Sequence, residues 1–310
     1  MVNPVAGLGA SSGLGRRLAG GAGASSSPDL EVVLVAAGSL EELRARAASV
    51  LAGQDPPEVL VVQGGDGMVS MGASLVAGTG IPLGIVPAGT GNDFARSAGL
   101  ELGEPAESIE RLLTALRTGS ARVREVDVMR ASVDGVERLA INSINVGFDA
   151  LVNRRANELQ RIPGTLRYLV ALVDSVGRYS TSDFVLATDG SEPLRVSAEL
   201  ITILNGSTMG GGISMASQAR IDDGVLDLVR VGGLTKLRLL AFFPLAMLGR
   251  HLRLSAVSLE RVRSLHLEVP PGVLIYADGE ELRGPGGGSC TLDVRIEPAG
   301  VRLVQPPDRG

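Results

Sequence analysis

The most concentrated chemistry in this sequence lies in a glycine-rich segment, GGDGMVS, at residues 64–70. An apolar run, EVLVVQ, directly precedes it, and a helical pattern follows. Glycines in such a turn let the backbone approach a ligand closely, and the first N–H groups of a helix attract an anion. The segment therefore predicts a phosphate-binding loop, formed by Gly64, Gly65, Asp66, Gly67, Met68, Val69 and Ser70.

Asp66 is the acidic residue of this loop. A carboxylate beside a phosphate is repelled unless a divalent cation lies between them, so the pairing indicates Mg²⁺. Asp66 is therefore a candidate catalytic residue. In the alternative interpretation the loop is an ordinary strand-to-helix turn, and Asp66 caps the helix.

A second loop, PAGTGND at residues 87–93, follows the next apolar run and opens another helical pattern. Loops at the carboxyl ends of neighbouring parallel strands converge on one crevice, where open α/β sheets bind ligands. Thr90 supplies a hydroxyl there, whereas Asn92 and Asp93 either contact the ligand or fix the turn. The N-terminal NPVAG segment is either a third backbone contact or an ordinary terminal loop, and its residues are Asn3, Pro4, Val5, Ala6 and Gly7.

Two later motifs, ARIDDGVLDL and YADGEEL, add carboxylates to Asp-Gly pairs. A tight turn at Asp223-Gly224 leaves neighbouring carbonyls and one carboxylate pointing inward, which suits Mg²⁺ completed by water. In the second motif Asp278 and Glu280 have the same parity on a strand, although the intervening glycine is equally compatible with a turn or bulge. A phosphate-accepting hydroxyl needs a carboxylate to take its proton, and Glu280 is the natural candidate.

Alternating strands and helices must position the glycine loops. From Glu31 to about Gly119, short apolar runs alternate with helical patterns, which is typical of a parallel sheet covered by helices. Strands are predicted at 31–37, 58–63 and 81–87. Helices are predicted from Ser39, which forms a capping box with Glu42, from Met68, and along the apolar face of Ile109, Leu112, Leu113 and Leu116.

After Glu125 the sequence becomes rich in strands, and the pairs Asp134-Gly135 and Asp189-Gly190 predict hairpin turns. Helical patterns interrupt around 156–176 and 234–252. We therefore predict an α/β nucleotide-binding domain with a parallel sheet, followed by a mostly antiparallel β-sandwich domain. The predicted domains are residues 1–125 and 126–298, followed by a closing strand or tail at 299–310. The sequence does not decide whether this closing segment joins the sheet of the first or of the second domain.

Composition excludes several classes of protein. The 310 residues are 45% hydrophobic and 20% charged, with a net charge of −5, which excludes disorder for most of the chain. Scattered arginines and a pI of about 5.3 argue against a nucleic acid partner. The longest apolar stretch, 239–248, is half of the ~20 residues that a membrane span needs. The single cysteine, Cys290, indicates a cytoplasmic location, and the single lysine, Lys236, excludes a Walker-type nucleotide site.

The ordered motifs NPVAG, GGDGM, PAGTGNDFAR, NVGFDA, NGSTMGGG, ARIDDGVLDL and ADGEEL resemble those of the diacylglycerol kinase catalytic-domain family. The resemblance runs from Asn3 to about Arg283, and the family includes bacterial lipid kinases and the sphingosine and ceramide kinases. It implies a nucleotide domain like that of NAD kinases and phosphofructokinases, a β-rich lipid-facing domain, and ATP as the phosphate donor.

The resemblance also implies roles for the matching residues. It assigns the nucleotide to Asn3–Gly7, Gly64–Ser70 and Thr90, with Asp66 close to the transferred phosphate. It assigns Mg²⁺ to the carboxylate of Asp223 and to two main-chain carbonyls, those of Arg220 and Val225. Asp278 and Glu280 fall in the catalytic ADGEEL motif, with Glu280 as the proton acceptor. The chain departs from the family in having Met68 for a threonine and in lacking the strand before Asn3.

The resulting hypothesis is an ATP-dependent, Mg²⁺-requiring lipid kinase, peripheral at the inner membrane surface. Its substrate is a membrane lipid, either diacylglycerol or a sphingoid base or other lipid alcohol. The segment 234–252 carries Phe242, Phe243 and Met247 beside arginines, and it either touches the bilayer or packs in the core. An NAD kinase-like activity on a soluble alcohol and a lipid-binding pseudokinase are the alternatives, and a homodimer is left open.

Overall fold

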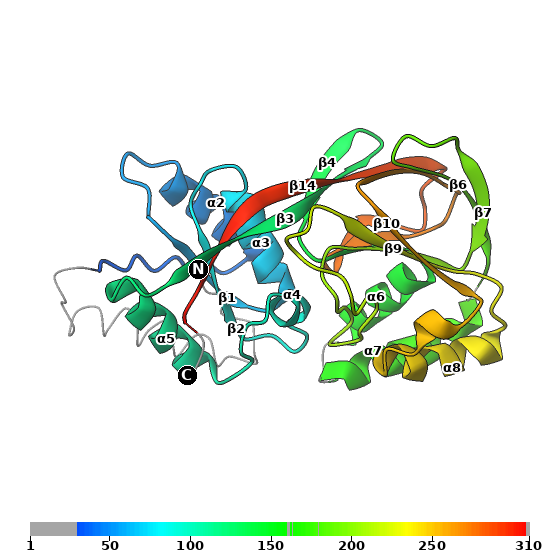
Figure 1. Ribbon diagram of the computed structural model, residues 1–310, viewed down its shortest axis with the longest axis horizontal. Helices are drawn as coiled ribbons and strands as arrows, with labels where there is room; N and C mark the ends of the chain where they lie inside the picture. Colours follow the sequence, from blue (N-terminus) through cyan, green and yellow to red (C-terminus); the bar gives the residue numbers. More distant parts are fainter. Residues whose placement is uncertain (1–29, 160–161, 163, 179, 308–310) are drawn as a thin grey trace. The chain divides into compact units, whose positions relative to one another are not determined.

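The structure is a computed structural model that describes residues 30–159, 162, 164–178 and 180–307 (Figure 1). The chain divides into two compact units, Met1–Val126 with Gly300–Gly310, and Asp127–Ala299. Two long strands, β3 (Arg122–Val133) and β14 (Cys290–Gln305), each begin in one unit and end in the other. The second unit is therefore inserted into the chain of the first.

The first unit is built on a parallel sheet, which confirms the predicted fold class. β1 (Leu60–Gly64) pairs in parallel with β2 (Leu83–Pro87), and Leu60 lies opposite Leu83. The end of β14 also pairs with β2 in parallel, with Leu303 opposite Leu83. The closing segment VRLVQP, whose sheet the sequence left open, thus belongs to the sheet of the first unit.

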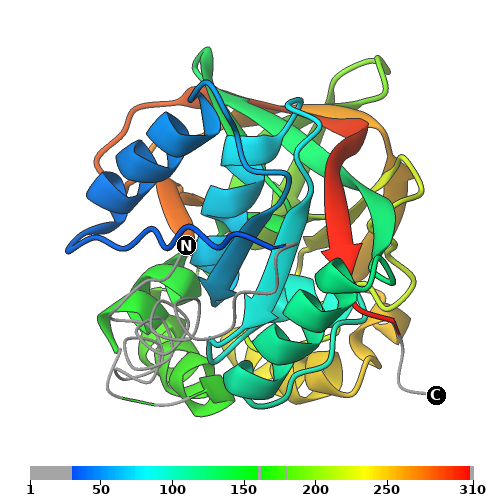
Figure 2. The same cartoon turned by 90° about the vertical axis from the view of Figure 1, so that its left-hand side faces the viewer.

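Helices cover both faces of this sheet (Figure 2). Gly72 of α3 (Asp66–Val76) packs on Val62 and Leu83, while Leu112 of α5 (Pro105–Arg117) packs on the opposite face, against Gly84. α2 (Leu40–Leu51) begins as predicted, because the Ser39 hydroxyl accepts a hydrogen bond from the Glu42 N–H at 3.2 Å. A short helix, α4 (Asp93–Ser97), follows the second glycine loop.

The predicted strand at 31–37 is wrong. Residues 30–35 have no regular secondary structure, and only Ala36 is a bridge residue. Val32, Val33 and Leu34 are 38%, 60% and 37% exposed, so no described residue buries this part of the apolar run. A β-branched run becomes a strand only where a neighbouring strand accepts its hydrogen bonds, and no described strand pairs with this segment.

The second unit is a β-sandwich, as predicted. One sheet has the order β10-β9-β8-β5-β12-β13, and the other contains β14, β11, β6 and β7, with β3 and β4 paired beside β14. The facing side chains form one core that includes Met129, Ile144, Phe184, Ile203 and Leu267. The strands are β4 (Val136–Ala140), β5 (Ser143–Gly147), β6 (Ser182–Thr188), β7 (Leu194–Ala198), β8 (Leu200–Leu204), β9 (Leu226–Val231), β10 (Val257–Val262), β11 (Ser264–Val269), β12 (Ile275–Ala277) and β13 (Glu280–Arg283).

Three helices cover the outer face of the six-stranded sheet (Figure 1). Phe242 is fully buried among them, so this part of the segment 234–252 packs in the core, whereas Met247 is 52% exposed. No described helix is long and apolar enough to span a bilayer. The helices are α6 (Phe148–Glu158), α7 (Gly164–Ser175) and α8 (Lys236–Met247), with 3₁₀ turns η2 (Val176–Arg178) and η3 (His251–Arg253).

Two predicted hairpin turns are confirmed in the second unit. Asp134-Gly135 joins β3 to β4, and Asp189-Gly190 joins β6 to β7. Both residues of each pair have positive φ, 49° and 83° in the first turn and 49° and 75° in the second. This is the type I′ geometry whose twist matches that of the flanking strands.

Candidate active site

The two glycine loops of the first unit meet backbone to backbone. They follow neighbouring parallel strands, and a Cβ built on Gly89 would lie 2.4 Å from the Cα of Gly65. The Ala88 N–H donates to the Gly64 carbonyl at 2.9 Å across the same junction. A side chain at Gly65 or Gly89 would push the loops apart, so the glycines permit the predicted convergence.

The carboxylate of Asp66 joins these two loops. Asp66 begins α3, yet its Oδ1 accepts a hydrogen bond from the main-chain N–H of Phe94, in the first turn of α4, at 3.1 Å. Asp66 therefore caps a helix, but the neighbouring helix rather than its own. The side chain is partly exposed beside two helix N-termini, which attract negative charge. A phosphate held by these N-termini would lie near a carboxylate, an arrangement that a cation must balance.

Asn92 shapes the second loop. Its Oδ1 accepts a hydrogen bond from the Gly89 N–H at 3.0 Å, and its Nδ2 donates to the Gly89 carbonyl at 2.9 Å. Its φ of 53° lies in the left-handed region, which asparagine tolerates better than most residues. Of the two roles open from the sequence, Asn92 thus fixes the turn. Thr90 is exposed in the loop, where its hydroxyl can meet a ligand.

Of the other residues predicted to contact the ligand in the first glycine loop, some are buried and some are exposed. Met68 and Val69 are buried, and both N–H groups donate to the Gly65 carbonyl, at 3.0 and 3.1 Å. Gly67 is exposed, and Ser70 is partly exposed. A ligand at this loop therefore meets the glycine backbone and the Asp66 side chain rather than the side chains of Met68 and Val69. The predicted contacts at residues 3–7 lie outside the described residues.

In the second unit, a buried carboxylate holds the acidic loop in place. Asp127 of β3 is 3% exposed, and its two oxygens accept hydrogen bonds from the Gly224 N–H at 2.7 Å and the Ala299 N–H at 2.9 Å. Its own N–H donates to the Ile221 carbonyl at 2.6 Å. Asp127 is not predicted from the sequence, and the available signal was a carboxylate inside the apolar run EVDVM.

Asp223, the predicted metal ligand, lies in this acidic loop. One carboxylate oxygen accepts a hydrogen bond from the Val225 N–H at 3.3 Å, and the other forms an ion pair with the guanidinium of Arg261. No three His, Cys, Asp or Glu side chains among the described residues form a metal-binding group. A cation here would depend on Asp223, the carbonyls of Arg220 and Val225, and water. These hard oxygens fit Mg²⁺, which would share the carboxylate with Arg261.

The hairpin of β12 and β13 carries Glu280 at its tip. Asp278 and Gly279 form its turn, with φ of 48° and 84°, so the turn that the sequence allowed is the observed geometry. Glu280 follows directly, opposite Ala277, and is exposed. Its carboxylate has no hydrogen bond or ion pair within the described part of the chain, so it is available to accept a proton.

Asp278 fixes the position of this hairpin. Its carboxyl group is buried and accepts three main-chain hydrogen bonds, from the N–H of Ile141 at 2.7 Å and those of Asn142 and Ser143 at 2.9 Å each. Asn157 of α6 also donates to the Gly279 carbonyl at 2.9 Å. The turn is therefore held from two sides, which determines where Glu280 lies.

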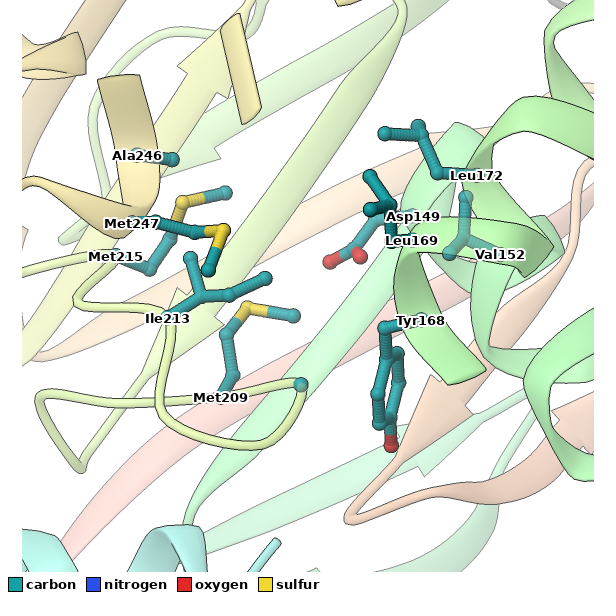
Figure 3. A pocket seen from close by; sticks show the side chains of 11 residues that line it. Asp149, Val152, Tyr168, Leu169, Leu172, Met209, Ile213, Met215, Ala246 and Met247 are labelled. Carbon is teal, nitrogen blue, oxygen red and sulfur yellow. The ribbon is translucent and has the colours of Figure 1, made fainter. Parts of the chain in front are cut away.

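An apolar pocket opens in the second unit between α6, α7, α8 and the segment 209–215 (Figure 3). Burial raises the pKa of the Asp149 carboxyl in its wall to about 7. Leu169 and Met247 are 48% and 52% exposed and form the mouth. The pocket is not predicted from the sequence, although Asp149 belongs to the NVGFDA motif. Its other lining residues are Val152, Tyr168, Leu172, Met209, Gly210, Ile213, Met215 and Ala246.

Both halves of the chain match known protein families. Residues 1–131 match the diacylglycerol kinase catalytic domain, and residues 142–305 match the YegS C-terminal NAD kinase beta sandwich-like domain. The chain belongs to the diacylglycerol kinase catalytic domain family. Membership confirms the resemblance seen in the sequence and, with it, the predicted class of lipid kinase, a phosphotransferase with an alcohol acceptor.

Relatives in this diacylglycerol kinase family cover most of the chain. A Mycobacterium tuberculosis protein named "Diacylglycerol kinase" is 34% identical over 281 residues, which are 89% of this chain and 85% of that protein. A Pseudomonas aeruginosa protein named "Probable lipid kinase YegS-like" is 31% identical over 270 residues, which are 81% of this chain and 80% of its own length.

A solved structure shares this fold. The crystal structure of a diacylglycerol kinase from Bacillus anthracis aligns with a TM-score of 0.67 over 99% of this chain and 95% of its own, at 20% identity. At this identity the likeness concerns the fold. It agrees with a parallel-sheet unit followed by an antiparallel sandwich, the fold class predicted from the sequence.

Proposed function

We propose that this chain transfers the γ-phosphate of ATP to the free hydroxyl of diacylglycerol, with Mg²⁺, while it is bound peripherally to a membrane. The observation that carries the proposal is the junction of the two glycine loops, where Asp66 links α3 to α4. Backbone N–H groups and a carboxylate at one place suit a nucleotide triphosphate with its metal. The Mycobacterium tuberculosis relative, named diacylglycerol kinase, supports this choice of lipid.

The residues of the two units have different tasks in this reaction. In the first unit, the glycine loops and Thr90 bind and orient the phosphates. Mg²⁺, when bound, would neutralise phosphate charge; Asp66 is the candidate carboxylate of the first unit, and Asp223 is the candidate ligand of the second unit. In the second unit, exposed Glu280 accepts the proton of the lipid hydroxyl, and Asp278 holds its hairpin. Catalysis then consists of positioning and charge neutralisation.

Exposed apolar side chains around the pocket mouth support contact with a bilayer. Leu166, Leu169 and Val173 of α7 are each about half exposed, as is Met247, and Leu248 is 69% exposed. The segment 232–259 around α8 has four Lys and Arg residues and no Asp or Glu. This apolar surface with cations beside it matches an anionic membrane, on which the lipid substrate would be presented.

The test is phosphate transfer from radiolabelled ATP with Mg²⁺ to four samples: dioctanoylglycerol, a sphingoid base, NAD and no acceptor. We expect labelled product with dioctanoylglycerol and no transfer with NAD. Transfer to NAD alone would establish the soluble-alcohol alternative. Lipid binding without transfer to any acceptor would establish the pseudokinase alternative. The Asp66→Asn variant controls for contaminating kinases, because its product should fall with the same protein present.

A further inference from the structure

The apolar pocket contains one carboxyl group whose hydrogen bonding is incomplete. Asp149 is 5% exposed, and its Oδ2 accepts a hydrogen bond from the Thr202 hydroxyl at 3.1 Å. Its Oδ1 has no partner within the described part of the chain. Figure 3 shows the carboxyl group pointing into the space enclosed by Met209, Met247 and Tyr168. Oδ1 thus presents a hydrogen-bonding atom to the pocket, where a ligand can bond to it.

The same side of the six-stranded sheet carries further polar groups behind Asp149. Asn145 of β5 lies directly opposite Thr202 of β8. The Oδ1 of Asn145 is buried and also has no partner among the described residues. Asn145 and Thr202 lie outside the lining of the pocket, and Asp149 supplies its one carboxyl group between apolar walls. A chain-like ligand with one polar atom has the chemistry that such a pocket recognises.

We infer that this pocket holds an acyl chain of the lipid and that Asp149 hydrogen-bonds the carbonyl oxygen of its ester. This inference rests on the proposed function and narrows its substrate to an acylglycerol. Burial favours the neutral carboxyl, which can donate its proton to a carbonyl oxygen. A neutral carboxyl group offers no charge to the cation of a sphingoid base, and the guanidinium of Arg167, 5.5 Å from the ring centre of Tyr168 in the pocket wall, is a further positive charge nearby.

The walls must move to admit the chain. The cavity measures about 30 Å³, enough for about two water molecules. Three methionines, Met209, Met215 and Met247, surround it, and methionine side chains repack easily around different shapes. The pocket therefore widens by rotamer changes at its methionines.

The test measures binding without nucleotide, so that it does not depend on phosphate transfer. A pyrene-labelled diacylglycerol is displaced by 1,2-dioctanoylglycerol or by its 1,2-dioctyl ether, which lacks the carbonyl oxygens. Wild type should bind the ester about fivefold more tightly than the ether, the difference that one net hydrogen bond provides. Asp149→Asn keeps a neutral donor and should keep the preference. Asp149→Leu should bind both lipids equally. Thr202→Val is a control, because it leaves Oδ1 of Asp149 in place. Its preference for the ester over the ether should stay within about twofold of the wild-type value.

Thermal unfolding of each variant shows whether it is folded before its binding is interpreted. An ester preference that survives in folded Asp149→Leu, or tighter binding of a sphingoid base than of the ester, would overturn the inference. Phosphorylation of the ester and ether is measured in parallel. Equal binding of both lipids by a wild type that phosphorylates them would overturn this inference and leave the kinase function standing. An ester preference without any transfer would overturn the kinase function and support the inference.

Discussion

The carboxylate of Asp66 accepts a hydrogen bond from the main-chain N–H of Phe94 at 3.1 Å, across 28 positions of sequence. The contact ties the start of α3 to the start of α4, so one side chain both closes the two glycine loops and presents negative charge beside them. A substitution at this position therefore affects the structure or the chemistry, depending on whether an acceptor oxygen is kept.

Asp66→Asn keeps an oxygen that can accept from Phe94 but removes the charge that orders a metal ion against the phosphates. We expect an unchanged melting temperature and a turnover number lower by on the order of a thousandfold. Asp66→Ala should lose the activity and also part of the stability. Steady-state kinetics and thermal unfolding of both variants separate the effects. An Asn variant with more than about a tenth of the wild-type rate would contradict the assignment.

Gly89→Ala should separate the two glycine loops, because the new Cβ would lie 2.4 Å from the Cα of Gly65. We expect a loss of about 1–3 kcal/mol in the free energy of unfolding and weaker ATP binding. Gly67→Ala is the matched control, since a Cβ there meets nothing within 4 Å. Urea unfolding of the two variants makes the comparison. Equal stabilities would show that the junction is not close-packed.

Glu280→Gln should leave ATP affinity unchanged and reduce phosphate transfer to the lipid by about a hundredfold or more, because it removes the proton acceptor. Glu281→Gln is the adjacent control. The Glu281 carboxylate accepts a hydrogen bond from the Tyr276 hydroxyl at 2.8 Å, so it is already engaged in the structure. ATP binding by calorimetry and transfer with labelled ATP are measured for both. A loss of ATP affinity in Glu280→Gln would instead indicate a nucleotide contact.

Arg261→Gln should lower the Mg²⁺ concentration needed for half-maximal activity, because the Asp223 carboxylate would no longer be neutralised by the guanidinium. The ion pair is partly exposed, so we expect an effect of up to about fivefold. Thermal unfolding at increasing Mg²⁺ gives a readout that does not depend on turnover. Arg220→Gln, which removes the neighbouring pair with Asp222, serves as the control. A raised Mg²⁺ requirement in Arg261→Gln would show that Arg261 supports the site instead.

Asp149→Asn should be stabilised relative to wild type by more at pH 8 than at pH 5. Burial raises the pKa of Asp149 from its ordinary 3.8 to about 7, so the folded wild type binds an extra proton between these values. Its stability therefore falls as pH rises from about 4 to about 7 and stays level above that, and the amide variant lacks this loss. Urea unfolding gives the free energy of unfolding of the variant and of wild type at each pH. The difference between the two proteins should be larger at pH 8 than at pH 5 by on the order of a few kcal/mol.

The elements that the sequence predicts well are those whose cause is local. The capping of α2 by Ser39 and the Asp-Gly turns depend on residues within a few positions of each other, so pattern and structure agree. The loop convergence also follows from local signals, because neighbouring parallel strands end at the same edge. The segment 31–37 fails for the opposite reason, since its state depends on a partner strand that its own residues cannot specify.

The same distinction explains which site residues are missed. Asp127 acts through Gly224 and Ala299, and Asp149 acts through Thr202, partners that lie 53 or more positions away in sequence. A carboxylate within an apolar run indicates a buried group that needs a hydrogen-bond donor, but the sequence does not identify that donor. The pocket around Asp149 combines residues from three helices and a loop, and their proximity is a property of the packed unit alone.

The strand β14 also has a consequence for the order in which the chain acquires its structure. Residues 303 and 304 pair with β2, and the Gln305 side chain donates to the Ala98 carbonyl at 3.1 Å, so the sheet under the glycine loops is closed by residues that are synthesised after the whole of the second unit. Contacts between positions that are more than two hundred residues apart form slowly, because a long loop must close first. On the ribosome the inserted second unit is complete before the first can be. Nucleotide binding is therefore expected to appear only after the second unit has been synthesised.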